Sequence, residues 1–416
     1  MFRSFIDFST GASDAQLEHL TQACQPATFG IQQQDVLDES YRKAGKIDAV
    51  NFSTNFNPNN AGILQSIRDS LLKNSESSIQ VELHKLNVYG MQKIKILHFG
   101  FPENLRVIAG PGSFFKSHVD TPKSRKMFGS LVVALPTKHE GGTFPLRHHG
   151  REWVFNSAEL VSLQISESES SRAAFVAFFG DIEHEVTEVK SGYRITLTYN
   201  LYFGDDKSTI VPPIMLPVDD TEAKIEKSLR ALLHDPKFLP EGGLVGFGLS
   251  HLYPIGSRQK GVNLRELGKN LKGTDATIKR ACDSLSLEIF VKTVYTSYYN
   301  REMDGVACLL DGIADPDPDE GQIEEDILLY LHKESSGLLV YDVKRKFLKE
   351  AEEAVRINGH DSEIPDVTPI LWLRPVTERN QLQASFVRYG NEASLEYVYG
   401  EICLVIQITA HEDRET

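Results

Sequence analysis

The chain has 416 residues, of which 41% are hydrophobic and 25% charged, as in ordinary globular proteins of two or three domains or one large domain. Its net charge of −14 argues against broad binding to nucleic acids or anionic membranes, which requires a basic surface. No signal-peptide core or membrane-span-length apolar run occurs, and the four cysteines are widely spaced. We therefore expect a soluble cytoplasmic or nuclear protein with free thiols and no nucleic-acid or membrane partner.

Residues 1–77 are predicted to form a helical support. Ser13 and Gln16 have the spacing of a capping box, and the segment AQLEHLTQA that follows is expected to form a short helix. A second helix is expected from 61 to 73, where apolar residues recur at helical spacing. Both helices are expected to support packing rather than chemistry.

From 78 to 205 the pattern changes to short strands separated by turns. SIQVELHKLNVY is rich in β-formers, GSLVVALP and AAFVAFF are short apolar runs, and YRITLTYNLYF alternates apolar with polar residues. Another strand is expected near 153–155, with Trp153 in the core. Many short strands of this kind indicate a β-sandwich or barrel.

Residues 206–416 are predicted to be a mixed α/β region. Helices are expected over 220–233 and over 341–357, and the charged stretch at 315–326 is expected to be a solvated loop or linker. Strand patterns return in ILWLRPV, LQASFVRYG and VYGEICLVIQI.

The segment FFKSHVDTP places His118 and Asp120 two residues apart. On an extended segment both side chains lie on the same face, where an imidazole and a carboxylate can bind the same cation. The pair is not specific by itself, because His411 and Asp413 repeat the spacing at the C-terminus with nothing downstream to complete a site.

His184 follows the strand AAFVAFF and supplies a second imidazole. Two histidines and one carboxylate form the facial triad of non-haem Fe(II) oxygenases, which leaves the opposite metal positions open. Ten residues further on, Arg194 begins a strand whose polar face is expected to point inward, and its planar guanidinium can grip a carboxylate. Thr196 lies on the same face. In the alternative interpretation, His184 is satisfied by a backbone carbonyl and Arg194 pairs with Asp181 or Glu183.

Taken together, GPGSFFKSHVDTP, GSLVVALP, EGGTF, DIEHEV and SGYRITLTYNLY resemble the prolyl 4-hydroxylase-type, α-subunit-like catalytic domain of the Fe(II)/2-oxoglutarate-dependent dioxygenases, over about 78–203. The resemblance implies a mainly β fold with flanking helices (α+β) around a double-stranded β-helix, or jelly-roll, core. It implies His118, Asp120 and His184 as iron ligands and Arg194 as partner of the distal 2-oxoglutarate carboxylate. No catalytic residue beyond these ligands is implied.

The implied reaction couples decarboxylation of 2-oxoglutarate to succinate and CO₂ with hydroxylation of a C–H bond by O₂, and ascorbate is a candidate further cofactor. A peptidyl proline and a small metabolite are the candidate substrates, and the oligomeric state is left open. The alternatives are a catalytically weakened oxygenase-fold binding or scaffold protein and a zinc hydrolase, which would leave Arg194 unexplained. For 206–416 the alternatives are a second, metal-free jelly roll and an α/β extension without a barrel.

Two features depart from the family pattern. Many prolyl hydroxylase-type enzymes carry a tyrosine on the strand after HxD that contacts 2-oxoglutarate, whereas here that strand reads LVVALP. Thr196 or Ser130 is therefore expected as the second carboxylate donor. In addition, about residues 91–109 form an insert ahead of the His118 strand, where we expect an extra hairpin. Displacement of that strand by the insert would threaten activity.

Overall fold

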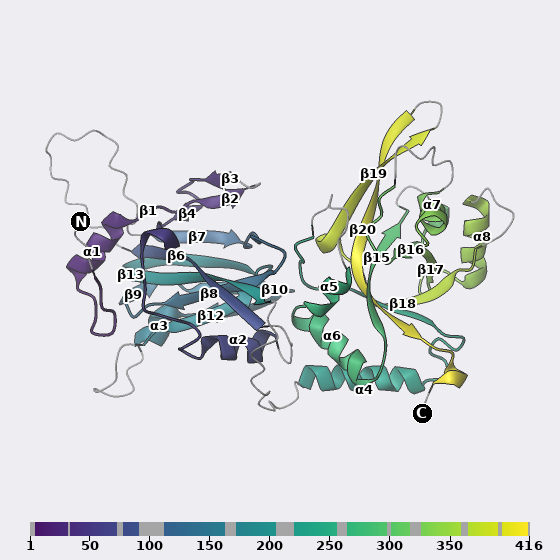
Figure 1. Ribbon diagram of the computed structural model, residues 1–416, viewed down its shortest axis with the longest axis horizontal. Coiled ribbons are helices and arrows are strands. Elements are labelled where there is room, and N and C mark those ends of the chain that lie inside the picture. Colours follow the sequence, from purple (N-terminus) through teal and green to yellow (C-terminus); the bar gives the residue numbers. More distant parts are fainter. Residues whose placement is uncertain are drawn as a thin grey trace. The chain divides into compact units, whose positions relative to one another are not determined.

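A computed structural model describes residues 5–31, 34–72, 78–90, 112–162, 172–204, 220–255, 264–297, 301–316, 326–358, 365–389 and 393–414. The chain divides into two compact units, an N-terminal unit of residues 1–212 and a C-terminal unit of residues 213–416 (Figure 1). The insert predicted at 91–109 lies outside the described residues.

The N-terminal unit is a jelly-roll-type barrel of antiparallel strands with flanking helices, which confirms the predicted fold class. Its longest strand, β13, pairs with β6, β7, β8, β9 and β10 along its length. The helices are α1 Asp14–Ala23, α2 Ile63–Leu71, α3 Ser157–Ser162 and the 3-10 helix η1 Ala49–Asn51. The strands are β1 Gln25–Pro26, β2 Phe29–Ile31, β3 Gln34–Val36, β4 Arg42–Lys43, β5 Gly45–Asp48, β6 Ser78–Gly90, β7 Ser113–His118, β8 Met127–Ala134, β9 His139–Gly141, β10 Phe144–His148, β11 Arg151–Phe155, β12 Ala174–Phe179 and β13 Glu183–Gly204.

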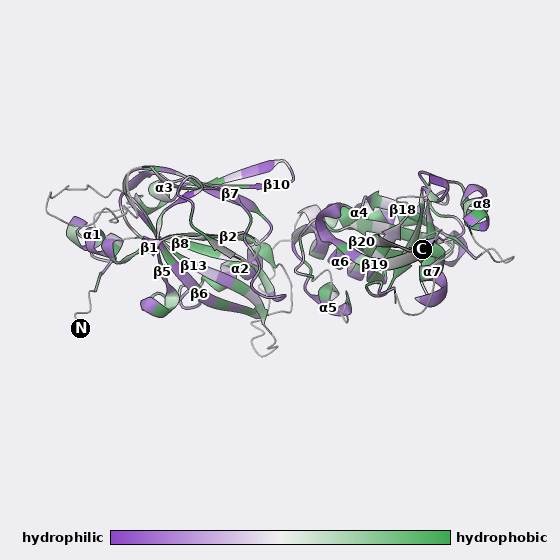
Figure 2. Cartoon of the chain, turned by 90° about the horizontal axis from the view of Figure 1, so that it is seen from above, coloured by the Kyte–Doolittle hydropathy of each residue, from purple (hydrophilic) through white to green (hydrophobic). Residues whose placement is uncertain are grey.

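Strand β13 is largely buried on both faces from Arg194 to Phe203 because it lies in the middle of the sheet. Ile195 and Leu197 pack into the apolar core, whereas Arg194 and Thr196 point to the opposite face and are buried as well. The neighbouring strand β8 is buried along its whole length. Figure 2 shows the hydrophobic colour around β8 and the hydrophilic colour on the β10–β11 hairpin. The polar set on β13 is therefore enclosed by the barrel.

Two local predictions in this unit have clear outcomes. The capping box is confirmed: the Ser13 hydroxyl accepts from the Gln16 backbone N–H, and the Gln16 side chain accepts from the Ser13 N–H. The placement of Trp153 in the core is wrong, since its side chain is 51% exposed. It lies on the edge strand β11, whose residues 151–154 are all exposed, so no neighbouring element buries its side chain.

The C-terminal unit is a mixed sheet covered by helices. Strand β14 pairs with β18 on one side and β20 on the other, which closes the order β14-β18-β17-β16-β15-β20 into a ring. The pairings β14–β18 and β17–β18 are parallel, a pattern absent from an antiparallel jelly roll. The region is a mixed α/β barrel. It therefore matches neither predicted alternative in full: its sheet closes, unlike an extension without a barrel, but its parallel pairs differ from a jelly roll.

The predicted helix at 220–233 is present, but the one predicted at 341–357 begins later. Its first residues belong to strand β17, and the helix begins at Leu348, because a short apolar run such as LLVY does not distinguish helix from strand. The helices are α4 Asp220–His234, α5 Leu264–Lys269, α6 Gly273–Ser284, α7 Ile327–Glu334 and α8 Leu348–Asn358, with η2 Arg301–Met303, η3 Glu378–Asn380 and η4 His411–Asp413. The strands are β14 Gly243–Gly248, β15 Ile289–Thr296, β16 Val306–Leu310, β17 Leu338–Asp342, β18 Thr368–Arg374, β19 Gln381–Tyr389 and β20 Ala393–Ile408.

The four cysteines are buried free thiols, as predicted. Burial raises the pKa of the Cys24, Cys282 and Cys308 thiols to about 12, so these groups stay protonated and unreactive at neutral pH. Across the described part of the chain, no helix combines the length and the apolarity needed to cross a bilayer.

Candidate metal centre

The barrel brings His118, Asp120 and His184 together. His118 ends strand β7 and lies directly opposite His184 in the pairing of β7 with β13, and Asp120 follows two residues beyond the strand end. The ligand atoms of the three side chains all lie within 4.8 Å of one another. His184 Nε2 is 3.7 Å from Asp120 Oδ1, less than twice a metal–nitrogen bond of about 2.1 Å, so a single ion can contact both.

Backbone contacts orient both histidines in the same way. His118 Nδ1 is 2.8 Å from the Lys116 carbonyl oxygen, and His184 Nδ1 is 2.8 Å from the Ile182 carbonyl oxygen. A carbonyl accepts only, so each Nδ1 must carry the hydrogen and donate. In the neutral rings this leaves both Nε2 atoms with free lone pairs, as metal coordination requires. The backbone carbonyl proposed as the alternative partner of His184 is thus present, and it supports a ligand role.

Asp120 is held as an ionised carboxylate. The Ser130 hydroxyl on β8 donates to Asp120 Oδ2 over 2.5 Å. Burial opposes ionisation, but the nearby His184 and the Ser130 hydrogen bond outweigh it, so the pKa of Asp120 is lowered. Burial, with His184 beside it, likewise lowers the pKa of His118 well below its ordinary value. Asp120 and His118 therefore tend toward the protonation states in which they can bind a cation.

Aromatic rings enclose the two imidazoles. Phe115 stacks on His118 with ring centroids 3.6 Å apart. Phe178 and Phe144 pack on His184 at 4.6 and 5.3 Å. These contacts restrict the imidazole rotamers, so the ligand directions are preset before any ion binds.

Arg194 lies near Phe144, the ring that also packs on His184, with its Cζ 5.9 Å from the phenyl centroid. Only 1% of the residue is exposed, and among the described residues it forms no ion pair, with Asp181, Glu183 or any other acid. Its Nη2 is buried without a hydrogen-bond partner. Burial lowers the pKa of Arg194 to about 10, which still leaves the guanidinium charged at neutral pH. A buried, unmatched cation of this kind is costly unless a ligand completes it.

Ser157 contacts the Arg194 guanidinium at Nε, and His139 in turn contacts Ser157. Arg194 Nε donates to the Ser157 hydroxyl over 3.2 Å, and that hydroxyl lies 3.0 Å from His139 Nε2. His139 Nδ1 contacts the Thr137 carbonyl oxygen at 2.9 Å, so Nε2 is the acceptor and the serine donates to it. Arg194 Nε therefore donates to Ser157, and Ser157 donates to His139. The Nη groups of Arg194 take no part in this chain and can donate to another acceptor.

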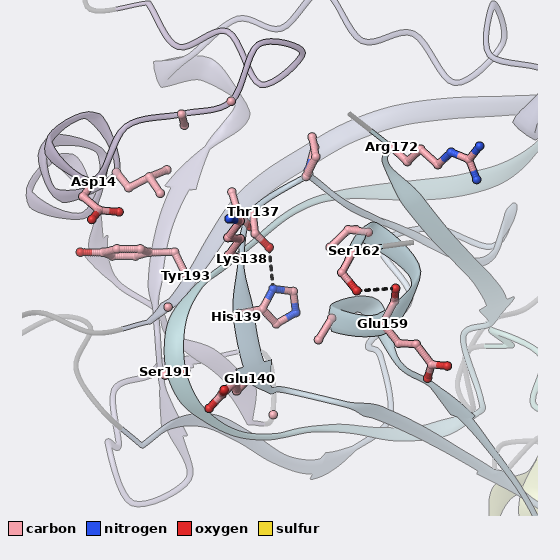
Figure 3. A pocket seen from close by; sticks show the side chains of 18 of the residues that line it. Asp14, Thr137, Lys138, His139, Glu140, Glu159, Ser162, Arg172, Ser191 and Tyr193 are labelled. Atoms are coloured by element: carbon pink, nitrogen blue, oxygen red, sulfur yellow. Dashed lines mark hydrogen bonds between the residues drawn. The ribbon is translucent and has the colours of Figure 1, made fainter. Parts of the chain in front are cut away.

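His139 also lines a recess drawn in Figure 3. Helix α1, strand β9 and helix α3 bound this recess, and Tyr193 and Asp14 lie across it from His139. Its lining, as far as the described residues define it, does not include the His118 triad or Arg194. His139 is half-buried and connects this recess with Ser157.

Sequence reasoning missed the contribution of β6. Tyr89 lies directly opposite Arg194, with the guanidinium carbon 5.5 Å from its ring centroid. Asn87, two residues earlier, lies opposite the buried Thr196 and donates to the Thr198 hydroxyl over 2.9 Å. The signal was the alternation in HKLNVY, which places Lys85, Asn87 and Tyr89 on the inner face.

These contacts bear on the predicted second carboxylate donor. The single hydroxyl hydrogen of Ser130 is directed to Asp120, so Ser130 is not available to a co-substrate near Arg194. Thr196 remains a candidate, and Tyr89 joins it because it lies across the strand pair from Arg194. The absence of tyrosine from β8 is therefore compatible with a phenol beside Arg194 that another strand, β6, supplies.

No family model matches the chain, and no curated protein matches it significantly. Solved structures similar to it include a 2OG-Fe(II) oxygenase-family oxidoreductase from Burkholderia pseudomallei (16% identity, TM-score 0.24, 35% of this chain and 54% of that chain). A prolyl-4-hydroxylase from Pseudomonas putida is also similar (15% identity, TM-score 0.25, 45% of this chain and 86% of that chain). A third similar structure is a prolyl hydroxylase from Trichoplax adhaerens in complex with a hypoxia inducible factor oxygen degradation domain peptide (14% identity, TM-score 0.27, 48% of this chain and 82% of that chain). The likenesses are distant, and the functional proposal rests on the side chains alone.

Proposed function

We propose that the N-terminal unit is an Fe(II)- and 2-oxoglutarate-dependent dioxygenase that hydroxylates a C–H bond. His118, Asp120 and His184 hold the metal, and Arg194 holds the distal carboxylate of 2-oxoglutarate. One observation carries the proposal: a two-histidine, one-carboxylate set and a buried guanidinium, which has no acid partner among the described residues, both lie beside the same ring, Phe144.

The donor set fits Fe(II) in particular. Two neutral imidazoles and one carboxylate on one side of an ion leave its other side open, which is the ligand set of non-haem Fe(II) oxygenases. The Nε2 atoms are free because backbone carbonyls occupy both Nδ1 hydrogens. The open side would take a chelating co-substrate and O₂.

The surroundings of Arg194 fit a dicarboxylate. The buried Nη2 has no partner, and a carboxylate would supply one in the parallel, two-bond geometry that a guanidinium favours. Thr196 and Tyr89 lie beside it on the two paired strands and can add hydroxyl donors. 2-Oxoglutarate is a five-carbon diacid, so its distal carboxylate can bind Arg194 while its other end binds the metal.

In this assignment the bound Fe(II) supplies redox chemistry with O₂ and 2-oxoglutarate, with succinate and CO₂ as co-products. The chain's own residues orient the co-substrate, keep Asp120 ionised and surround the metal ligands with Phe115, Phe144 and Phe178, which limit access of water. A peptidyl proline or a small metabolite remains the candidate substrate, with ascorbate as a candidate further cofactor.

The test is an anaerobic titration of the full chain with Fe(II) and 2-oxoglutarate. A weak visible charge-transfer band should develop only when both are present, and succinate should form on exposure to O₂. His184→Ala should abolish the band, because the loss of one of three protein ligands removes most of the metal affinity.

His411→Ala is the matched control, since it removes a histidine from the second HxD pair of the same chain and should leave the band unchanged. Absence of iron binding in the wild-type protein would overturn the proposal. A band without succinate formation, with any candidate substrate, would instead favour the oxygenase-fold binding or scaffold protein.

A further inference from the structure

The barrel interior holds a second group of cations, further along the β6–β13 strand pair than Arg194. Lys85 lies on the same inner face of β6 as Tyr89, four residues earlier, and faces Thr198 on β13. At the rise of a strand this places it about 13 Å along β6 from Tyr89. Tyr89 faces Arg194, so the two cations lie at separate positions along the β6–β13 strand pair.

Arg42 reaches the same region from β4. Only 3% of it is exposed; its Nη2 donates to Asn87 Oδ1 over 2.8 Å, and its Cζ lies 4.3 Å from the centroid of Phe115, the ring that stacks on His118. Arg42 Nε is buried and has no hydrogen-bond partner. As at Arg194, a buried guanidinium is left incompletely matched.

Acidic groups near Lys85 are already engaged. Asp48, opposite Lys85 on β5, pairs with Lys46 at 3.5 Å. Glu82, at the exposed end of β6, accepts from the Tyr202 hydroxyl over 2.7 Å. Asp120 is close enough for the charge of Lys85 to lower the pKa of its carboxyl, but that carboxylate belongs to the candidate metal site.

The Lys85 ammonium itself makes no hydrogen bond or ion pair with any described residue. Burial and the charge of Arg42 lower its pKa to about 8, so it remains mostly protonated at neutral pH. A protonated ammonium beside a buried guanidinium is unfavourable in the empty site and becomes favourable when an anion lies against it.

We propose that Lys85, with Arg42 behind it, binds a carboxylate of the substrate, so that the enzyme acts on a carboxylic acid or on a peptide with an acidic side chain beside the oxidised C–H bond. This inference rests on the proposed dioxygenase function. The two groups of cations divide the work: Arg194 takes the co-substrate and Lys85 takes the substrate.

The experiment compares acid and amide probes that differ in one charge. The full chain, loaded anaerobically with Fe(II) and saturated with 2-oxoglutarate, is titrated by calorimetry with N-acetylproline and N-acetylprolinamide, with 3-phenylpropionate and its amide, and with acetyl-Pro-Asp-amide and acetyl-Pro-Asn-amide. We expect the acid to bind about tenfold more tightly than its amide in at least one pair, as a charge-assisted hydrogen bond gives. A preference among the small acids indicates a free carboxylate, and one confined to the aspartyl peptide indicates an acidic side chain.

Lys85→Met and Lys85→Gln should reduce that preference to near unity while leaving Fe(II) and 2-oxoglutarate binding intact, and Lys85→Arg should retain it. Lys138→Met, the same charge change at an exposed position outside the barrel, should have no effect. Melting curves verify that each variant is folded.

The inference is overturned if no acid is preferred over its amide, or if the preference survives Lys85→Met and disappears in Arg194→Gln, which would place the carboxylate in the co-substrate site. Failure of the dioxygenase proposal has a different signature, because the Fe(II) and 2-oxoglutarate band would be missing before any probe is added. An acid preference dependent on Lys85 would still support the site in that case.

Discussion

Each of the two units buries a charged side chain. In the C-terminal unit the buried acid Asp275 is paired with an arginine, whereas in the N-terminal unit the buried Arg194 has no acid partner among the described residues. In the C-terminal unit, Asp275 is 0% exposed and accepts hydrogen bonds from the Ser250 N–H, the Tyr253 hydroxyl and the Arg374 guanidinium. In the N-terminal unit, Arg194 is almost as completely buried, and among the described residues its one hydrogen-bond partner is the Ser157 hydroxyl.

The difference separates structural charge from functional charge. A buried charge that is fully paired specifies packing, because removing its partner leaves an uncompensated group in a medium of low dielectric constant. A buried charge without a partner lowers the stability of the empty protein and becomes favourable when a ligand of opposite charge arrives. The two sites should therefore respond to mutation with opposite signs.

The largest effect is expected for Asp275→Ala, which should destabilise the C-terminal unit by about 3–5 kcal/mol, because it leaves Arg374 and several donors unmatched. Urea unfolding in a Trp153→Phe background monitors this unit alone, since Trp372 is then the remaining tryptophan. Asp311→Ala, which removes a surface partner of Lys292, should change stability by less than about 1 kcal/mol. An unchanged midpoint for Asp275→Ala would contradict the structural role.

Arg194→Met should have the opposite pattern. We expect the empty protein to be as stable as the wild type or more so, whereas 2-oxoglutarate affinity should fall by about a hundredfold or more through loss of two charge-assisted hydrogen bonds. Titration of the visible band measures this, with Fe(II) affinity nearly unchanged. Arg147→Met, at a surface arginine paired with Glu152 and Glu185, is the control and should leave 2-oxoglutarate binding intact. Parallel loss of iron and 2-oxoglutarate binding would indicate misfolding instead.

Ser157→Ala should have smaller effects on both stability and 2-oxoglutarate affinity. The Arg194 Nε–H and His139 Nε2 each lose their partner, which should cost about 1 kcal/mol of stability and several-fold in 2-oxoglutarate affinity, because the guanidinium is less firmly oriented. Ser162→Ala, in the same helix but bonded only to the Glu159 carbonyl, is the matched control. If both variants bind 2-oxoglutarate as the wild type does, Ser157 has no positioning role.

The smallest effect concerns pH and His84. Burial, together with the charges of Lys85 and Lys123, lowers the pKa of His84 to about 4, against about 6.5 when unfolded. Below pH 6.5 the unfolded chain therefore binds a proton that the folded chain does not, so stability should be full above pH 6.5 and fall as the pH decreases toward 4. Urea midpoints at pH 7 and pH 5 should differ less in His84→Gln than in the wild type. Equal pH dependence would exclude this contribution.

Local patterns were sufficient for much of the fold. Alternation in YRITLTYNLYF predicted a strand with one apolar and one polar face, and the capping residues Ser13 and Gln16 predicted a helix start, because both signals depend on neighbours in sequence. Where a pattern was short, as before Leu348, the partner strands decided the outcome, and Trp153 lies at a sheet edge that no local pattern reveals.

The sequence by itself determined the residue types of the candidate site: His118, Asp120, His184 and Arg194 were recognisable from spacing, order and resemblance. Only the tertiary structure decided that Tyr89 lies opposite Arg194, that Arg42 reaches the inner face of β6 through Asn87, and that Ser130 serves Asp120 instead of a co-substrate. The physical reason is that spacing along a chain fixes which face a side chain takes, whereas the pairing of distant strands fixes which faces meet.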